Sequence, residues 1–165
     1  MNKLFLIVFV AVFFTACNKE DAQLNSIVKI ATVSNPQNLT NFQLTQDDSV
    51  KLWVVENKLK YYRPKDKQRV IVNYSILSTK PIGSSYKHDV LVNDIYEILT
   101  KDIFDITSNT QDSIGNDPIH IHDMWVSNDF LNVEFSYLGF SKMHFINLVR
   151  DASKTYTDNK VHLEF

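Results

Sequence analysis

The 165-residue sequence contains only one cysteine, Cys17, so no disulfide can form within the chain. Glycine and proline are also scarce, at three and four residues, and neither sign of charge dominates, because the formal net charge is −2. Nucleic-acid-binding proteins normally carry a strongly basic face, so this balance predicts no nucleic-acid partner. Without disulfides, the fold must depend on apolar side chains packed in a core.

The chain also lacks the short motifs of several enzyme classes. It has no G-x-S-x-G nucleophile motif, no glycine-rich phosphate-binding loop and no H-E-x-x-H zinc motif. Its carboxylates are numerous, but they form no pair that can be recognised from spacing. We therefore predict a protein that is not an enzyme and that needs no cofactor.

The first residues have the pattern of a cleaved bacterial lipoprotein signal. Lys3 precedes an apolar run of 13 residues from Leu4 to Ala16, which is shorter than the roughly 20 residues needed to span a bilayer. The run ends in Phe14-Thr15-Ala16-Cys17, which resembles a lipobox. We predict a signal peptide over residues 1–16 and a covalent lipid on Cys17 that anchors the protein to a membrane. The alternative is a structural thiol in a segment that is cut elsewhere.

A charged segment follows the predicted lipid attachment site. Lys19, Glu20 and Asp21 resemble the surface-export tag of some Bacteroidota lipoproteins, and they equally fit a solvated tether over residues 17–25. We therefore expect the outer membrane as the location, with the protein facing the cell exterior if the tag is functional.

The first part of the chain shows the two-residue period of half-buried strands. Apolar residues alternate with polar ones at Val28–Thr32, Val50–Val54 and Val70–Ile76, and Val90–Leu99 is a further run rich in β-branched residues. Four or five short strands over residues 26–102 predict a small β-barrel, for which OB-like and SH3-like barrels both fit.

A second group of short, aromatic-rich strands is predicted over residues 103–165. These strands are Ile119–Val126, Leu131–Tyr137, Met143–Val149 and Val161–Phe165, with a short helix as the alternative for Met143–Ser153. The last strand is apolar and would leave an exposed edge at the end of the chain. We therefore expect either that this last strand lies in the centre of its sheet or that the chain is a truncated form of a longer protein.

Several runs resemble the NigD-like lipoproteins of Bacteroidota. They are Arg69–Tyr74, Glu97–Asp102, Asp112–Pro118, Leu131–Tyr137, His144–Val149 and Val161–Phe165. The resemblance implies an all-β protein, with an N-terminal OB-like barrel and a C-terminal β-sandwich domain on a lipid anchor. It implies no catalytic residues. The family takes its name from a bacteriocin-associated operon, which suggests a role in immunity to a bacteriocin. The sequence departs from the family pattern at two points. Lys67 stands where the family often has glycine, and the sequence ends at Phe165, so we expect the β-sandwich domain to be incomplete.

Three histidines are the only candidates for a metal site. His120 and His122 lie on one face of their predicted strand, and His144 could approach them across Leu131–Tyr137. If Ile119, Ile121 and Trp125 face the core, the two histidines instead face outward or toward the first domain. We expect exposed histidines and no metal, and a metal-dependent or hydrolytic enzyme using all three is the alternative function.

Tyr61, Tyr62 and Arg63 lie in a run of basic residues and are candidates for ligand contact. Aromatic and cationic side chains on an OB-like barrel could stack on a glycan or bind an anionic ligand. The same residues also fit a solvated loop whose tyrosines cover the end of the barrel. The leading hypothesis is a lipid-anchored, non-enzymatic binding module with an envelope protein, glycan or bacteriocin as partner. A purely structural role in an envelope complex is a further alternative.

Overall fold

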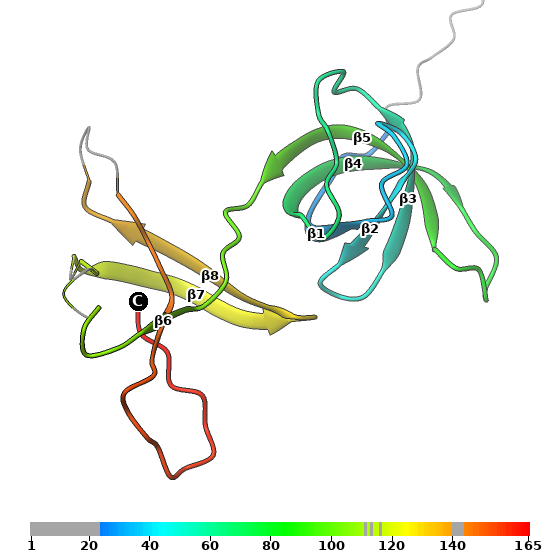
Figure 1. Cartoon of the computed structure of the whole chain (residues 1–165). Helices are drawn as coiled ribbons and strands as arrows, with labels where there is room; N and C mark the ends of the chain where they lie inside the picture. Colours follow the sequence, from blue (N-terminus) through cyan, green and yellow to red (C-terminus); the bar gives the residue numbers. More distant parts are fainter. Residues whose placement is uncertain (1–23, 111, 113, 116, 140–143) are drawn as a thin grey trace, which may run out of the picture.

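The computed structural model describes residues 24–110, 112, 114–115, 117–139 and 144–165. Its first five strands are β1 (Ile27–Ser34), β2 (Phe42–Gln46), β3 (Lys51–Asn57), β4 (Arg69–Thr79) and β5 (His88–Glu97). They close into a barrel in the order β1-β2-β3-β5-β4, in which only the β3–β5 pair is parallel (Figure 1). This five-stranded closed topology confirms the OB-like barrel.

Alternating inward-facing side chains fill the barrel. Its core consists of Ala31, Val33, Phe42, Leu44, Leu52, Val54, Val70, Val72, Tyr74, Val90, Val92 and Ile95. Strand β2 was not predicted, because only Phe42 and Leu44 mark its inner face and its third inward residue is Gln46. Gln46 is buried there because its Nε2 donates a 2.7 Å hydrogen bond to the Tyr74 hydroxyl. Because Gln46 is polar, the alternation of apolar residues does not predict that its side chain is buried.

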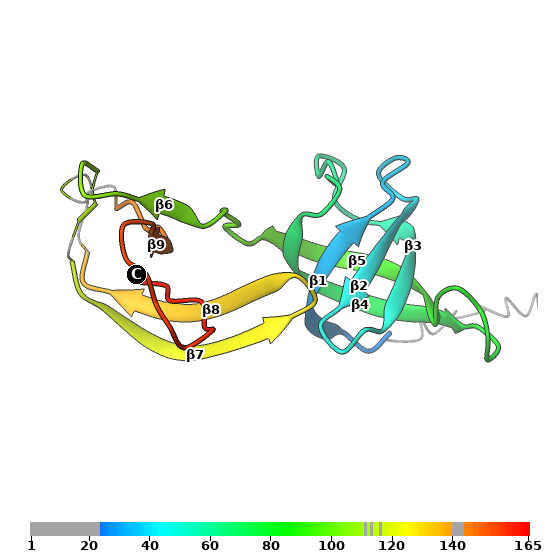
Figure 2. The same ribbon diagram turned by 60° about the horizontal axis from the view of Figure 1, so that its bottom comes forward.

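Over its described residues, the second module forms four strands in two sheets. Strand β6 (Phe104–Ile106) pairs in parallel with β9 (Val149–Asp151), and β7 (Ile119–Ser127) pairs antiparallel with β8 (Phe130–Tyr137). Figure 2 shows the long β7–β8 hairpin reaching toward the barrel, with β6 and β9 at its other end. Asn128, at φ 51°, supplies the left-handed conformation that the tight hairpin turn needs.

Two predictions for the end of the chain are wrong. The predicted strand Met143–Val149 is irregular over residues 144–148, and no helix forms over 144–153 either; the strand there is β9. The predicted strand Val161–Phe165 is reduced to one antiparallel bridge between Glu164 and Val149. Among the residues that the structure describes, no helix is long and apolar enough to cross a bilayer.

A β-bulge gives the β7–β8 hairpin two chemically different faces. The pairing shifts by one residue between Ile121 and Asp123, so His122 is an extra residue in β7. Past the bulge, Met124 pairs with Val133, and Trp125 falls on the opposite face with Asn132. In a regular strand Trp125 would share a face with Ile119 and Ile121, and the bulge places it on the opposite face.

We call one side of the hairpin the apolar face and the other the polar face. The apolar face carries the paired residues Ile119, Ile121, Met124, Val126, Leu131, Val133, Phe135 and Tyr137. The polar face carries His120, His122, Asp123, Trp125, Ser127, Phe130, Asn132, Glu134 and Ser136. The tip of the polar face is what contacts the barrel.

Candidate functional site

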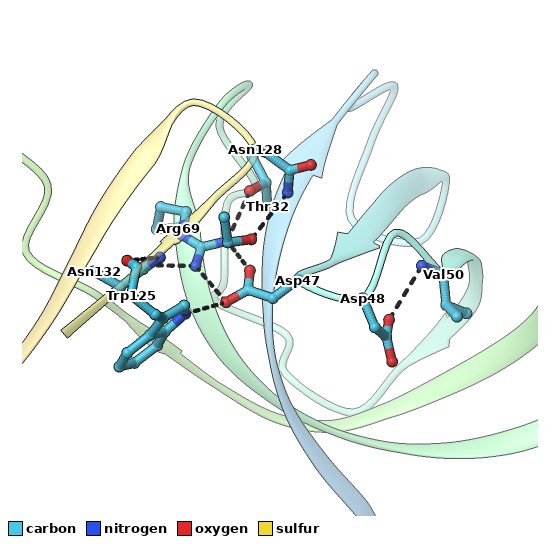
Figure 3. Close-up of polar contacts among 9 residues, drawn as sticks. Thr32, Asp47, Asp48, Val50, Arg69, Trp125, Asn128 and Asn132 are labelled. Atoms are coloured by element: carbon cyan, nitrogen blue, oxygen red, sulfur yellow. Dashed lines mark hydrogen bonds and ion pairs between the residues drawn. The ribbon is translucent and has the colours of Figure 1, made fainter. Parts of the chain in front are cut away.

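The most developed polar site is a cluster where the hairpin meets the barrel. We call it the Arg69 junction. Thr32, Asp47 and Arg69 of the barrel meet Trp125 and Asn132 of the hairpin there (Figure 3). Phe130 of the hairpin also contacts Arg69. Arg69 is the first residue of β4 and pairs with Thr32 of β1, and Asp47 directly follows β2. Three segments of the barrel therefore converge at this point.

Arg69 is almost completely buried, with 2% of its surface exposed. Its guanidinium donates to both Asp47 oxygens, from Nη1 to Oδ1 at 2.7 Å and from Nη2 to Oδ2 at 3.1 Å. Nη1 also donates to Thr32 Oγ1 at 3.0 Å, while Nε has no partner in the structure. A two-pronged Arg–carboxylate pair in a buried setting fixes both side chains in one geometry.

The hairpin completes the set of partners around this ion pair. Arg69 Nη2 donates to Asn132 Oδ1 at 2.6 Å, and Trp125 Nε1 donates to Asp47 Oδ2 at 3.0 Å. The guanidinium carbon also lies 5.1 Å from the centre of the Phe130 ring, within cation–π range. The ion pair belongs to the barrel, and these three contacts from the hairpin attach the second module to it.

The environment of Asp47 keeps it ionised. Burial alone would raise the pKa of Asp47, but hydrogen bonds from Arg69, Trp125 and Ser127, together with the Arg69 charge, hold that pKa below its ordinary value. The Asp47 carboxylate and two Arg69 nitrogens bond each other, and Asn132 and Trp125 add bonds from the hairpin, so the junction attaches the second module to the barrel.

The three candidate histidines do not form one site. The His120 and His122 rings lie 4.7 Å apart on the polar face, and His122 Nε2 is 2.9 Å from Ser136 Oγ. His144 instead contacts Tyr137, which belongs to the apolar face, with ring centres 4.9 Å apart. Among the described residues, no three His, Cys, Asp or Glu side chains gather closely enough to hold a metal ion.

The candidate ligand contacts Tyr61, Tyr62 and Arg63 diverge. Tyr61 is 92% exposed, whereas Tyr62 packs against the barrel core beside Phe42 and donates to Gln68 Oε1 at 2.9 Å. Burial, with a smaller contribution from Glu97, raises the pKa of Tyr62 to about 12. Arg63 bonds the backbone oxygens of residues 60 and 62. Only Tyr61 presents an aromatic surface, and ligand contact here stays a prediction.

Two open depressions lie on the barrel. One of about 390 Å³ lies beside the Arg69 junction and is lined by Val28, Lys29, Ile30, Gln46, Asp47, Asp48 and Ile71. The other, of about 550 Å³, lies between residues 65–68 and 97–100. Asp48 is not free in the first, because its Oδ1 accepts the Val50 backbone N–H at 3.1 Å (Figure 3).

The predicted lipid attachment site, Cys17, and the export tag Lys19-Glu20-Asp21 lie outside the described residues. They stay predictions. The Arg69 junction, in contrast, was missed from the sequence. Its one local signal is a charged residue directly before the alternating strand pattern of Val70–Ile76, and the partner Asn132 is 63 positions away.

Three solved structures are similar to this chain. A protein of unknown function from Bacteroides vulgatus ATCC 8482 is 31% identical, with a TM-score of 0.68 over 82% of this chain and 64% of that one. A protein from Parabacteroides distasonis ATCC 8503, whose name describes it as toxin related, is 35% identical, with a TM-score of 0.65 over 76% and 62%. A NigD-like immunity protein from Bacteroides caccae ATCC 43185 is 18% identical, with a TM-score of 0.54 over 77% and 60%.

The chain spans about three fifths of the length of these three structures. No curated protein matches it. Two family models match in tandem: the NigD-like N-terminal OB domain over residues 30–98 and the NigD-like C-terminal β-sandwich domain over residues 102–165. The matches agree with the barrel and with the two-sheet second module, and they confirm the resemblance drawn from the sequence. This all-β chain therefore belongs to the NigD-like family.

Proposed function

We propose that this protein is a lipid-anchored component of the cell envelope that acts as a non-enzymatic binding or interaction module. The observation that carries the proposal is the segment from Lys3 to Cys17, in which an apolar run too short to span a bilayer ends in small residues before the only cysteine. Acyl chains on Cys17 would hold the protein at the outer membrane without a spanning helix. Lys19, Glu20 and Asp21 would then favour the outward-facing leaflet.

The modules themselves support binding more than catalysis. The buried Arg69–Asp47 ion pair of the barrel bonds to the hairpin, and the three histidines lie at two different faces of the hairpin. Related family members carry names that refer to unknown function, toxins and immunity, and none of these names describes an enzyme. We therefore propose that the β-modules are displayed at the membrane for a protein or glycan partner, with bacteriocin immunity as one form of that role.

Metabolic labelling with an alkyne fatty acid tests the anchor. Because Cys17 is the only thiol, the wild-type chain should incorporate the label, and Cys17→Ser should lose it completely and leave the membrane fraction. Equal labelling of both chains would overturn the proposal. Replacing Lys19, Glu20 and Asp21 by alanine should preserve labelling and reduce digestion of the protein by protease added to intact cells.

The absence of an enzymatic role is tested separately with the purified protein. We expect no turnover of polysaccharide, ester or peptide substrates above the uncatalysed rate. Turnover at enzyme-like rates that is abolished by His120→Ala or His122→Ala would establish the alternative function.

A further inference from the structure

The loop between β3 and β4, residues 58–68, concentrates positive charge on the barrel. Together with Arg69 it holds six of the 17 lysine and arginine residues of the chain. The five loop cations are all exposed, and none forms an ion pair among the residues that the structure describes: Lys58, Lys60, Arg63, Lys65 and Lys67. Lys58 bonds the neutral side chain of Asn93, and Arg63 bonds backbone oxygens. The loop therefore presents unpaired positive charge to solvent.

Two carboxylates lie close to this loop without neutralising it. Asp66 Oδ1 accepts the backbone N–H of Asn35 at 3.2 Å, so Asp66 is engaged with the loop between β1 and β2. Glu97 of β5 lines the second depression together with Lys65 and Lys67. Five cations against these two carboxylates leave a positive surface on a chain whose formal net charge is −2.

Inward-facing side chains hold the loop in one conformation. Leu59 and Tyr62 pack against the barrel core. The Tyr62 hydroxyl donates to Gln68 Oε1 at 2.9 Å, and the Gln68 backbone N–H donates to the Lys65 oxygen at 3.2 Å. Because Leu59 and Tyr62 point inward, Tyr61 is turned to solvent with 92% of its surface exposed. The loop is preorganised, so a ligand that binds it pays little to order it.

An exposed tyrosine among unpaired cations defines the chemistry of a matching ligand. A tyrosine ring offers a large apolar face on which a flat group can stack, and lysine and arginine bind acid groups. A polymer of acidic sugars offers both features, because a sugar ring has an apolar C–H face and its carboxylate or sulfate carries the charge. Nucleic acid also offers both, and the proposed location in the cell envelope favours the sugar.

The loop lies at the end of the barrel where β1 ends. Val33 exchanges backbone hydrogen bonds with Lys67 and Gln68, and Figure 2 shows the β1–β2 and β3–β4 loops at this end. The chain from Cys17 enters the barrel at Ile27, the first residue of β1, which is ~20 Å from Val33 along the strand. An anchored chain thus carries the loop at the end of the barrel that is farther from the anchor.

We propose that the β3–β4 loop is a binding site for an acidic polysaccharide. Tyr61 stacks on a sugar ring, and Lys58, Lys60, Arg63 and Lys65 contact acid groups of that ring and its neighbours. The proposal deepens the proposed function by naming a class of ligand, and it takes only the location in the envelope from it. The loop and its anchoring residues lie within the barrel domain that the family model matches over residues 30–98.

Isothermal titration calorimetry on the full chain, purified in detergent, tests the site. Polygalacturonate and heparin are the acidic probes, and dextran is the uncharged control. At about 0.15 M salt, which screens weak long-range attraction, we expect saturable binding of at least one acidic probe and none of dextran. Tyr61→Ala should lower that affinity at least about tenfold, whereas Tyr156→Ala, at an exposed tyrosine of the second module, should leave it unchanged.

A matched pair of charge variants separates the loop from general attraction to a polyanion. Lys60→Gln with Lys65→Gln removes two charges from the loop, and Lys51→Gln with Lys87→Gln removes two exposed charges at the far end of β3. The first pair should lower the affinity at least about tenfold and the second less than about threefold. Equal losses from the two pairs, full affinity in Tyr61→Ala, no binding, or tighter binding to polyglutamate, oligothymidylate or anionic lipid vesicles would each overturn the proposal.

Folding and anchoring are controlled separately. All the replaced side chains are exposed, so each variant should keep the far-UV circular dichroism spectrum of the unsubstituted chain. The calorimetry needs no membrane, so its result is independent of the labelling of Cys17. A chain that binds the probe without being labelled supports the loop site and overturns the anchor, and a labelled chain that binds no probe does the reverse.

Discussion

The Arg69 junction makes a quantitative prediction about stability. Replacing Arg69 by Met keeps most of the side-chain volume but leaves Asp47, whose side chain is 23% exposed, with only its neutral donors. Removing one member of a buried ion pair costs about 3–5 kcal/mol, and the partial exposure of Asp47 places this case near the lower end, at about 3 kcal/mol. Asp47→Leu should cost a similar amount, because the Arg69 charge is then left buried.

The double variant separates the charge from the packing. In Arg69→Met combined with Asp47→Leu, no unpaired charge remains, so the loss should be smaller than the sum of the single losses by about 2–3 kcal/mol. The free energy of unfolding is measured by urea titration at pH 7, with far-UV circular dichroism as the signal. A loss below about 1 kcal/mol for Arg69→Met, or strictly additive losses in the double variant, would refute this account of the junction.

Three further outcomes are expected. Asn132→Ala removes the 2.6 Å bond to Arg69 and should cost about 1–2 kcal/mol and speed protease cleavage between the modules, whereas Ser136→Ala should do neither. The pKa of Asp47 is lowered in the folded state, so its stabilisation is present above the ordinary Asp pKa of about 4 and is lost as pH falls through the lowered value. Asp47→Asn should accordingly flatten the dependence of the urea midpoint on pH below about pH 5, and an unchanged slope would contradict this. The pKa of Tyr62 is raised to about 12, so its contribution to stability is lost as pH rises from about 10 toward 12, and Tyr62→Phe should remove the late component of the tyrosine absorbance titration.

How much the sequence predicts differs between the two modules. Strands β4 and β5 are predictable because apolar residues alternate with polar ones in β4 and β-branched residues are frequent in β5, and Val70, Val72, Val90 and Val92 do line the barrel interior. Strand β2 was not, because the inward Gln46 depends on a tyrosine 28 positions away. The local alternation of apolar residues predicts which apolar side chains are buried. It does not predict the burial of a polar side chain that is hydrogen-bonded to a distant partner.

The hairpin shows a second limit. Both of its strands are predicted from the sequence, but the face on which Trp125 lies is not, because no residue type in β7 indicates the register shift between Ile121 and Asp123. The Arg69 junction was missed for a related reason. Asp47 resembled an ordinary turn residue, and its bonds to Arg69 and Trp125 span 22 and 78 positions. Contacts of this kind follow from the closed barrel and the docked hairpin, and they exist only once both have formed.

The extra residue at His122 explains why Ile121 and Met124, three positions apart in the sequence, lie on the same face of the hairpin. Deletion of His122 would leave a regular strand in which Ile121 still pairs with Phe135 and Asp123 still pairs with Glu134. Trp125 would then stay opposite Asn132 and keep its place beside Asp47. A change of one residue in the length of β7 at this point is therefore compatible with the Arg69 junction.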